Sequence, residues 1–424
     1  MVLILAAILP AALALALGAA QTPPAGDASR LARIRAQMRR SLSELPNFTC
    51  LQTIERQQRA PRSRTVDVSD TVRLEVAQVG SKELFSWPGA ERFEDKDIND
   101  IVGEGMTGTG DFALLARNLF LTTAAVITYA GDERLDGRPA VRYDYRISLS
   151  NYGYKIIVDG VAAVVPYGGS FWIESETLDL LRLTQFTDQV PDHLGVAEVS
   201  NEIRYAKAPL AGRTFLLPRS AESGLKFFSG AFHVNRVVFS NCRQYSANTS
   251  ISFDTTPDRP SASETIAAGL DLPPGLSIET RLETPIDSRD AAVGDPITAR
   301  LTRDLKIDGR VIAPKDAALS GRIRRLVRYR APSPYVEVGL YFSELRFGDT
   351  RAPLSAELEE IGSLETLLGA SARFTPPRRD RWRQRIPVTR QAARPGVGIL
   401  FLSGARAALP KGFQMIWKTT APVP

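Results

Sequence analysis

The chain contains very few of the side chains on which most catalytic and metal sites depend. Its 424 residues include two Cys and two His. The histidines, His193 and His233, exclude a three-histidine zinc site and leave little for a His-dependent triad. Neither cysteine has a Cys or His nearby at metal-ligand spacing, and no Gly-x-Ser-x-Gly nucleophile elbow occurs. We therefore expect a protein that is not an enzyme and that has no cofactor and no metal.

Long apolar runs are absent except at the start of the chain. Residues 2–20 contain no charged side chain and end in Leu17-Gly18-Ala19-Ala20, which supplies the small residues that signal peptidase requires. We predict a signal peptide over residues 1–20 and a protein that is exported to the periplasm or the extracellular space and is soluble after cleavage. The alternative is an N-terminal membrane anchor, because a run of about 20 apolar residues can span a bilayer.

The two cysteines, Cys50 and Cys242, follow this segment and lie far apart in the sequence. Disulfides form and persist in exported proteins. We predict that these two residues are paired, and that the bridge joins the first and last strands of one N-terminal domain.

The residues between the cysteines are typical of β-strands. A helix is expected first at 28–45, where Leu31, Ile34 and Met38 recur at steps of three and four residues. The predicted strands are 48–55, 66–76, 83–87, 124–130, 139–148, 169–173, 178–187, 197–205, 213–218 and 232–246. Turn signals separate them, and residues 112–120 have helical composition. This pattern predicts a large antiparallel sheet with helices over one face.

A second β region follows a linker that we expect at 256–271. Three similar turns, at 272–275, 313–316 and 409–412, each combine proline with a following Gly or Asp and lead into an apolar run. They predict a smaller all-β barrel or sandwich over residues 272–424. The expected fold class is therefore mainly β with a few helices, an α+β protein.

Two segments of the first region resemble a known group of periplasmic proteins. The predicted helix leads into Asn47-Phe48-Thr49-Cys50-Leu51-Gln52-Thr53, and a hairpin is expected over residues 169–183. Together they resemble the LolA, LolB and RseB group across residues 28–255. The resemblance implies a curved antiparallel half-barrel, closed by helices over an apolar cavity. It implies that the chain binds a lipid acyl chain or a lipidated segment.

Residues 272–424 resemble the β-barrel domain of TrbI-type conjugal-transfer proteins. The similarity lies in the turn Ala313-Pro314-Lys315-Asp316-Ala317-Ala318-Leu319-Ser320-Gly321, where Asp316 replaces the glycine of the family pattern. The resemblance implies a barrel-like shape for this region. Because Asp316 departs from the family pattern, we do not infer a transfer function from it.

Large aromatic side chains near the ends of predicted strands are candidates for lining the apolar cavity. They are Phe85, Trp87, Trp172 and Phe186. If they converge on the concave face of the sheet, the half-barrel binds its ligand between them. This is the principal functional hypothesis, that of a non-enzymatic cell-envelope protein with an apolar ligand.

Arginine clusters in the second region suggest a different function. Residues 261–424 contain 25 Lys and Arg against 18 Asp and Glu, so the positive charge of the chain lies there. The candidate residues for an anionic surface are Arg322, Arg324, Arg328, Arg330, Arg381, Arg383 and Arg385. The alternative hypothesis is an assembly module that docks on an anionic membrane or an envelope protein. A charged edge strand explains the first cluster equally. Nucleic acid is not an expected partner of an exported protein.

Two further patterns have ordinary explanations. Residues 103–108 satisfy the glycine spacing of a dinucleotide fingerprint, but the preceding residues are charged and do not form a buried strand, so a surface loop is expected. Glu174 and Glu176 have the residue type of a glycosidase pair, but paired catalytic carboxylates usually come from different elements across a cleft. A solvated hairpin tip is expected there.

Overall fold

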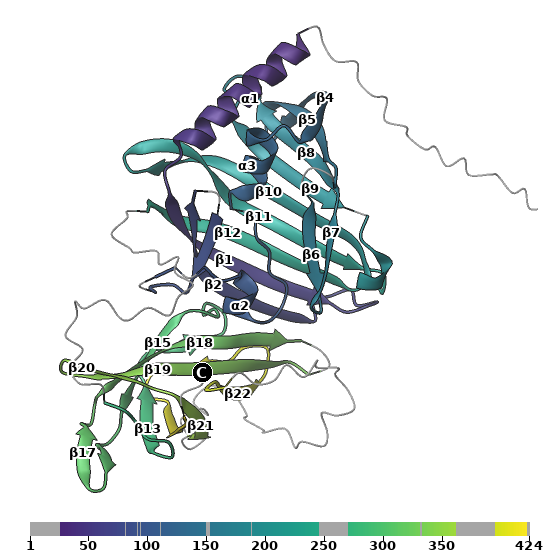
Figure 1. The fold of residues 1–424 in the computed structure, drawn as a ribbon. Coiled ribbons are helices and arrows are strands. Elements are labelled where there is room, and N and C mark those ends of the chain that lie inside the picture. The colour runs from purple at the N-terminus through teal and green to yellow at the C-terminus, as the bar shows by residue number, and fades with distance from the viewer. Residues whose placement is uncertain are drawn as a thin grey trace, which may run out of the picture.

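The computed structural model shows two regions joined along one edge (Figure 1). It describes residues 26–80, 82–90, 92–93, 95–110, 112–149, 153–187, 189–245, 270–330, 333–361 and 395–421. The predicted signal peptide and most of the predicted linker lie outside the described residues, as do Arg381, Arg383 and Arg385.

The N-terminal region is a curved antiparallel sheet of ten strands. In spatial order they are β4 (Ala125–Leu135), β5 (Arg138–Ile147), β8 (Tyr167–Glu174), β9 (Leu180–Thr187), β10 (Val196–Leu210), β11 (Arg213–Phe227), β12 (Phe232–Gln244), β1 (Phe48–Arg59), β2 (Val68–Val79) and β3 (Lys82–Ser86). The prediction of a mainly β fold with a large antiparallel sheet is confirmed. The strands follow the chain order, except that β1, β2 and β3 come after β12.

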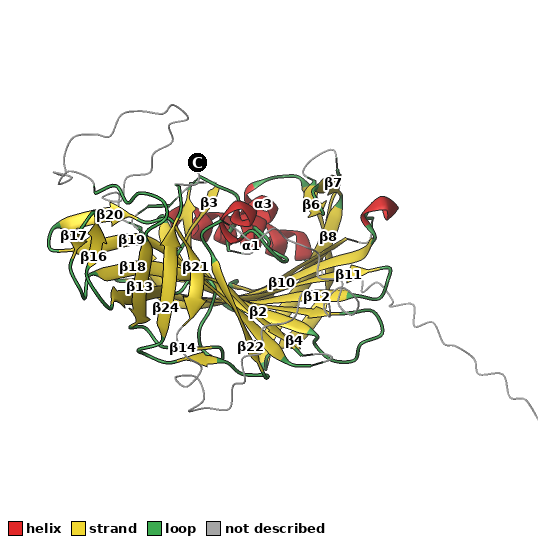
Figure 2. Ribbon diagram, turned by 90° about the horizontal axis from the view of Figure 1, so that it is seen from below, coloured by secondary structure: helices red, strands yellow, loops and turns green. Residues whose placement is uncertain are grey.

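Helices occupy the concave side of this sheet (Figure 2). They are α1 (Asp27–Glu44), α2 (Ile98–Val102) and α3 (Leu114–Leu121). The buried face of α1 contains Ile34, Met38 and Leu42, as the three and four residue spacing predicts. The ring of Phe120 from α3 meets that of Phe171 from β8 edge to face, with centroids 5.2 Å apart. The upper part of the concave face is therefore filled by the protein's own side chains.

A hairpin that the sequence analysis did not anticipate covers the lower part of the concave face. It consists of β6 (Tyr154–Val158) and β7 (Val161–Val165), which form a sheet of their own. Asp159 and Gly160 at its tip both have positive φ, as a two-residue hairpin turn requires. The Asp-Gly pair was the sequence signal for this hairpin.

In the described residues from 270 onward, every element is a strand. The strands are β13 (Ser277–Leu282), β14 (Ile286–Asp287), β15 (Pro296–Leu301), β16 (Leu305–Ile307), β17 (Arg310–Ala313), β18 (Ala318–Tyr329), β19 (Tyr335–Phe347), β20 (Thr350–Pro353), β21 (Ala356–Ile361), β22 (Gly398–Ser403), β23 (Ala408–Leu409) and β24 (Gln414–Thr419). Trp417 and Phe342 pack edge to face in the interior. Asp316, which replaces a glycine of the TrbI-type pattern, adopts the left-handed φ of 68° that an Asp tolerates.

The two regions share a sheet. Strand β18 pairs with β2 through Val327, Arg328 and Tyr329, in addition to its pairing with β15 and β19. Val72 of β2 also forms a parallel bridge with Val293. The edge of the half-barrel sheet beside β2 is therefore covered by the second region, which protects exposed backbone groups from other chains.

Candidate functional site

Cys50 and Cys242 form the predicted disulfide, with Cα atoms 4.1 Å apart. The bridge joins the first and last strands of the half-barrel in chain order, as predicted, but these are not the two edges of the sheet, because β1 pairs with both β12 and β2 and the edges are β4 and β3. The bridge instead joins two neighbouring strands inside the sheet. It holds the first strand of the chain against the last strand of the half-barrel.

The four aromatic residues that the sequence analysis placed in a cavity do not converge. Phe85 lies on the concave side, paired in register with Val76, and is buried in the main core. Phe186 is 44% exposed, and its neighbours Gln185 and Thr187 are buried. Because side chains alternate along a strand, Phe186 points to the outer face.

Trp172 also lies on the outer face, since its neighbour Phe171 faces the core. Its ring is stacked against the guanidinium of Arg182, 3.9 Å from the ring centroid, and its indole Nε1 donates to Glu133. The alternation of β8 therefore places Trp172 in a polar stack outside the half-barrel, where it does not line a concave cavity.

Trp87 lies where the two regions meet. The guanidinium of Arg324 is 4.7 Å from its ring centroid. At Gly294, whose φ is 100°, an added Cβ would lie 2.6 Å from the ring. Trp87 therefore contributes to the contact between the regions.

The arginines of β18 are used inside the molecule. Arg322 donates to the backbone oxygens of Pro88 and Gly294, Arg324 donates to that of Ile101, and Arg328 donates to that of Ser288. These three side chains are half-buried, and burial lowers the pKa of Arg322 and Arg328 from their ordinary value.

Neither sequence interpretation of this cluster matches the arrangement, because β18 is an internal strand. A bulge between Ile323 and Arg325 also breaks the alternation that the sequence pattern assumed. Of the four candidate arginines between residues 322 and 330, only Arg330 has an exposed side chain in the described structure.

The concave face carries an apolar row that runs straight across six strands. Pairing registers align one inward residue from each of β9, β10, β11, β12, β1 and β2. The members of this apolar row are Leu183, Ile203, Ala221, Val237, Ile54 and Val72, and each is at most 5% exposed. Each strand contributes one short apolar side chain, and together they form a band.

A polar row lies directly beside the apolar row. Two residues further along each strand, the same registers align Gln185, Asn201, Ser223, Asn235, Arg56 and Asp70. Gln185, Asn201, Asn235 and Arg56 are buried. No single strand reveals this row, since each contributes one polar residue to it.

Residues 103–110 cover one end of the polar row. Arg56 donates to the carbonyl oxygen of Glu104, and Asn235 donates to that of Met106 over 3.0 Å. A Cβ added at Gly105 would lie 2.8 Å from the Arg56 guanidinium. The expected surface loop is therefore packed on the concave face, and the glycine allows its close approach to an arginine.

The same loop is held from the other side by the second region. Arg325 of β18 forms ion pairs with Glu104 and with Glu337 of β19. The two carboxylates raise the pKa of Arg325 against the opposing effect of burial. One residue of the second region thus fixes the cover of the half-barrel.

The hairpin of β6 and β7 covers another part of the concave face, at the start of β10 and the end of β11. Ile156 and Val165 are buried in a small cluster with Val196, and Leu225 and Phe227 pack partly buried against it. On its other side the hairpin exposes apolar side chains: Ile157, Val161 and Val164 are each about half exposed.

The histidines and carboxylates weighed in the sequence do not form a catalytic arrangement among the described residues. His193 is exposed, and His233 lies against Phe227, where burial lowers its pKa. Glu174 ends β8 and accepts from Arg138 over 3.4 Å, and Glu176 is exposed in the turn. The described residues also contain no cluster of His, Cys, Asp and Glu that could hold a metal.

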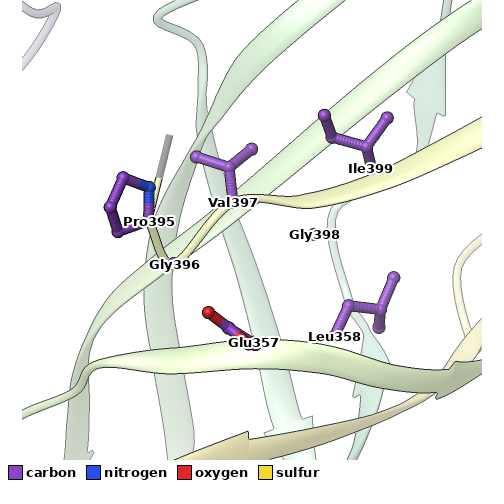
Figure 3. Close-up of a pocket in the computed structure, with 7 residues that line it drawn as sticks. All are labelled: Glu357, Leu358, Pro395, Gly396, Val397, Gly398 and Ile399. Atoms are coloured by element: carbon purple, nitrogen blue, oxygen red, sulfur yellow. The ribbon is translucent and has the colours of Figure 1, made fainter. Parts of the chain in front are cut away.

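A separate pocket lies between β21 and β22, in the second region (Figure 3). Its volume is about 290 Å³, and Glu357, Leu358 and residues 395–399 line it. Both lining segments border residues 362–394, which lie outside the described structure. We assign no ligand to it.

Comparisons with known proteins give structural similarities only. No protein-family model and no curated protein matches this chain. A putative outer membrane lipoprotein-sorting protein domain from Vibrio parahaemolyticus is 11% identical, with a TM-score of 0.28, over 49% of this chain and 90% of that one. A DUF1329 family protein from Desulfovibrio piger is 11% identical, with a TM-score of 0.28, over 51% of this chain and 93% of that one. Mycobacterium tuberculosis lipoprotein LppX is 11% identical, with a TM-score of 0.18, over 51% of this chain and 98% of that one.

At these TM-scores the similarities carry no argument about function. The LolA, LolB and RseB resemblance of the N-terminal region is confirmed as an architecture, a curved antiparallel sheet with helices on its concave side. The TrbI-type resemblance of the second region stays a prediction. Within the described residues, no helix is both long enough and apolar enough to cross a membrane.

Proposed function

We propose that this chain is an exported, non-enzymatic cell-envelope protein that binds an apolar ligand, a lipid acyl chain or a lipidated segment, on the concave face of its half-barrel. The observation that carries the proposal is the partly buried apolar surface of Val199, Leu225 and Phe227, which lies beneath the hairpin. The apolar row on the same face is at most 5% exposed and belongs to the main core, so it supports this surface from inside. Burial of an acyl chain against such a surface gains about 25 cal/mol for each Å² of apolar surface removed from water.

The lower end of the concave face supports a route of entry. Val199, Leu225 and Phe227 are only partly buried there. The hairpin above them forms its own two-stranded sheet, so it can shift without breaking the hydrogen bonds of the main sheet. Its exposed Ile157 and Val164 offer apolar surface beside the entrance.

The disulfide supports the proposed location. Cys50 is fully buried and bonded to Cys242. Structural disulfides are typical of oxidising compartments such as the periplasm or the exterior.

The second hypothesis, docking on an anionic membrane through the basic region, has less support. Arg322, Arg324 and Arg328 already bind backbone oxygens at or near the contact between the regions. The hypothesis then depends on Arg330 and on arginines outside the described residues.

Mass spectrometry of lipids that co-purify with the mature protein tests the proposal. We expect one or a few lipid species in stoichiometric amount, and a smaller amount with Leu225→Gln, which places an amide on the concave face. Val238→Gln is the matched control, because Val238 is 53% exposed on the outer face. Recovery of no lipid, together with no saturable binding of a fluorescent acyl probe, would contradict the proposal.

A further inference from the structure

The concave face carries a polar row beside its apolar row, although a site for a purely apolar chain needs no polar side chains. The apolar row is followed at once by the polar row, in the same registers and on the same face. A buried polar group without a hydrogen-bond partner costs about 1–3 kcal/mol. The polar row therefore lowers the stability of the folded state unless the chain or a ligand supplies hydrogen-bond partners for it.

The charged end of the row is satisfied by the chain itself. The Arg56 guanidinium donates to both carboxylate oxygens of Asp70 and to the carbonyl oxygen of Glu104. Its charge is neutralised by the paired carboxylate, and its donors have acceptors. This end does not offer a cation to an anionic ligand.

The side-chain amide of Asn235, unlike Arg56, is only partly hydrogen-bonded. Its side chain is 4% exposed, and its Nδ2 donates to the carbonyl oxygen of Met106 over 3.0 Å. That contact fixes which end of the amide is the oxygen, since a flipped amide would place two acceptors together. The Oδ1 atom is buried and has no hydrogen-bond partner among the described residues.

Gln52 repeats this feature on the neighbouring strand. It lies on β1 two inward positions from Arg56, with Ile54 between them, and is 3% exposed. Its Oε1 is likewise buried without a partner among the described residues. Gln78 of β2, which is 3% exposed and has the inward parity of Val76, carries a third such oxygen. Gln52 and Gln78 lie beyond the apolar row, so of these three oxygens only that of Asn235 lies next to the partly buried surface at Leu225.

We propose that the Asn235 Oδ1 accepts a hydrogen bond from the polar group of an amphipathic ligand, whose acyl chain lies along Val199, Leu225 and Phe227. The inference rests on the proposed function and narrows its ligand class. The polar group must donate hydrogen bonds, as a hydroxyl or an amide N–H does. A free carboxylate is disfavoured because it has no proton to donate and would face the carbonyl oxygen of Asn235.

Four probes with the same acyl chain test the inference on the full mature protein. Monopalmitoylglycerol supplies hydroxyl donors, palmitamide supplies N–H donors, methyl palmitate supplies no donor and palmitate supplies a carboxylate. Their affinities are measured by displacement of a fluorescent acyl probe. We expect at least one donor probe to bind about tenfold more tightly than methyl palmitate, since a buried hydrogen bond has about that effect.

Two variants locate the preference. Asn235→Leu removes the proposed acceptor, and Gln52→Met removes a buried acceptor beyond the apolar row, while each keeps the side chain's size. Asn235→Leu should weaken the donor probes about three- to tenfold and leave methyl palmitate unchanged, whereas Gln52→Met should leave all four affinities unchanged. Gln57→Met is the matched control, because it removes an amide from the outer face of the same strand and should leave all four affinities unchanged. Unfolding transitions of the variants verify that they fold.

The outcomes separate this inference from the proposed function. Equal binding of the donor probes and methyl palmitate, tightest binding of palmitate, or a donor preference that persists in Asn235→Leu would overturn the inference while apolar binding stands. Failure of every probe to bind would remove the proposed function and the inference together. A donor preference that identifies either the hydroxyl or the amide probe supports the inference and names the source of the donor.

Discussion

The two regions differ in how completely their buried polar side chains are hydrogen-bonded. In the second region, the buried polar side chains Thr280, Thr419 and Glu337 all have hydrogen-bond partners. In the half-barrel, Asn235 and Gln52 keep buried oxygens without a partner among the described residues. The indole Nε1 of Trp417 is the exception in the second region, on a side chain that is otherwise packed against Phe342.

The buried polar side chains of the second region are thus mostly hydrogen-bonded, whereas the half-barrel retains buried amide oxygens without a partner among the described residues. Buried amides occur on the concave side of the half-barrel, and the buried polar side chains described in the second region include no amide. Unsatisfied polar groups in a native interior require an explanation. We propose that a bound ligand satisfies the Asn235 oxygen, which lies next to the partly buried apolar surface at Leu225.

The largest expected effect is loss of the disulfide. The Cys50→Ala, Cys242→Ala double variant should lower the free energy of unfolding by up to about 5 kcal/mol, because the bridge closes a very long loop in the unfolded chain. Denaturant unfolding measures the change. The half-barrel should unfold first, whereas loss of structure confined to residues 270–421 would contradict the assignment of the bridge to the half-barrel.

The Trp417→Ala variant tests whether the second interior is tightly packed. Trp417 is 1% exposed, and its removal should lower stability by about 3–5 kcal/mol. Leu225→Ala, on the partly open concave face, should lower it by only about 1 kcal/mol. A similar loss for both variants in denaturant unfolding would break the distinction between the two regions.

The Arg325→Met variant tests the contact between the regions. It leaves Glu337 buried without its cation and releases Glu104, so stability should fall by about 2–3 kcal/mol. Amide hydrogen exchange should rise in residues 103–110. Arg330→Met, at an exposed side chain beside the same strand, is the control and should change stability by less than about 0.5 kcal/mol. Unchanged exchange in the loop would show that Arg325 does not hold it.

The smallest expected effect is a pH dependence from His233. Burial lowers its pKa below the ordinary value of 6.5, so the folded state favours neutral imidazole. The stability that this provides is present above pH 6.5 and is lost as pH falls through the lower, folded pKa. His233→Gln should flatten that part of the stability profile, and the exposed His193→Gln should not. A wild-type profile that rises with acidification would give the wrong sign.

Local patterns in the sequence predicted most of the strands. The β-branched alternation of residues 48–55 and 139–148 matches β1 and β5 closely. The predicted turns at 272–275, 313–316 and 409–412 each precede a strand. These features depend on neighbouring residues, so a single sequence contains them.

Features that depend on strand pairing could not be predicted in the same way. The polar row exists because registers bring Asn201 beside Ser223 and Asn235 beside Arg56, residues far apart in the chain. β18 pairs with β15, β19 and β2, and this internal position gives internal partners to arginines that looked like a surface cluster in the sequence. Trp172 was assigned to a cavity by residue type, but alternation places it outside.

The most direct test of the account is the position of a bound acyl chain. A photoreactive fatty alcohol cross-linked to the full mature protein, and mapped by peptide mass spectrometry, reports that position. The account predicts labels within residues 196–203, 221–227 and 233–237, with others on the hairpin 154–165. Labels confined to the outer face around Trp172 and Phe186, or to residues 270–421, would contradict it.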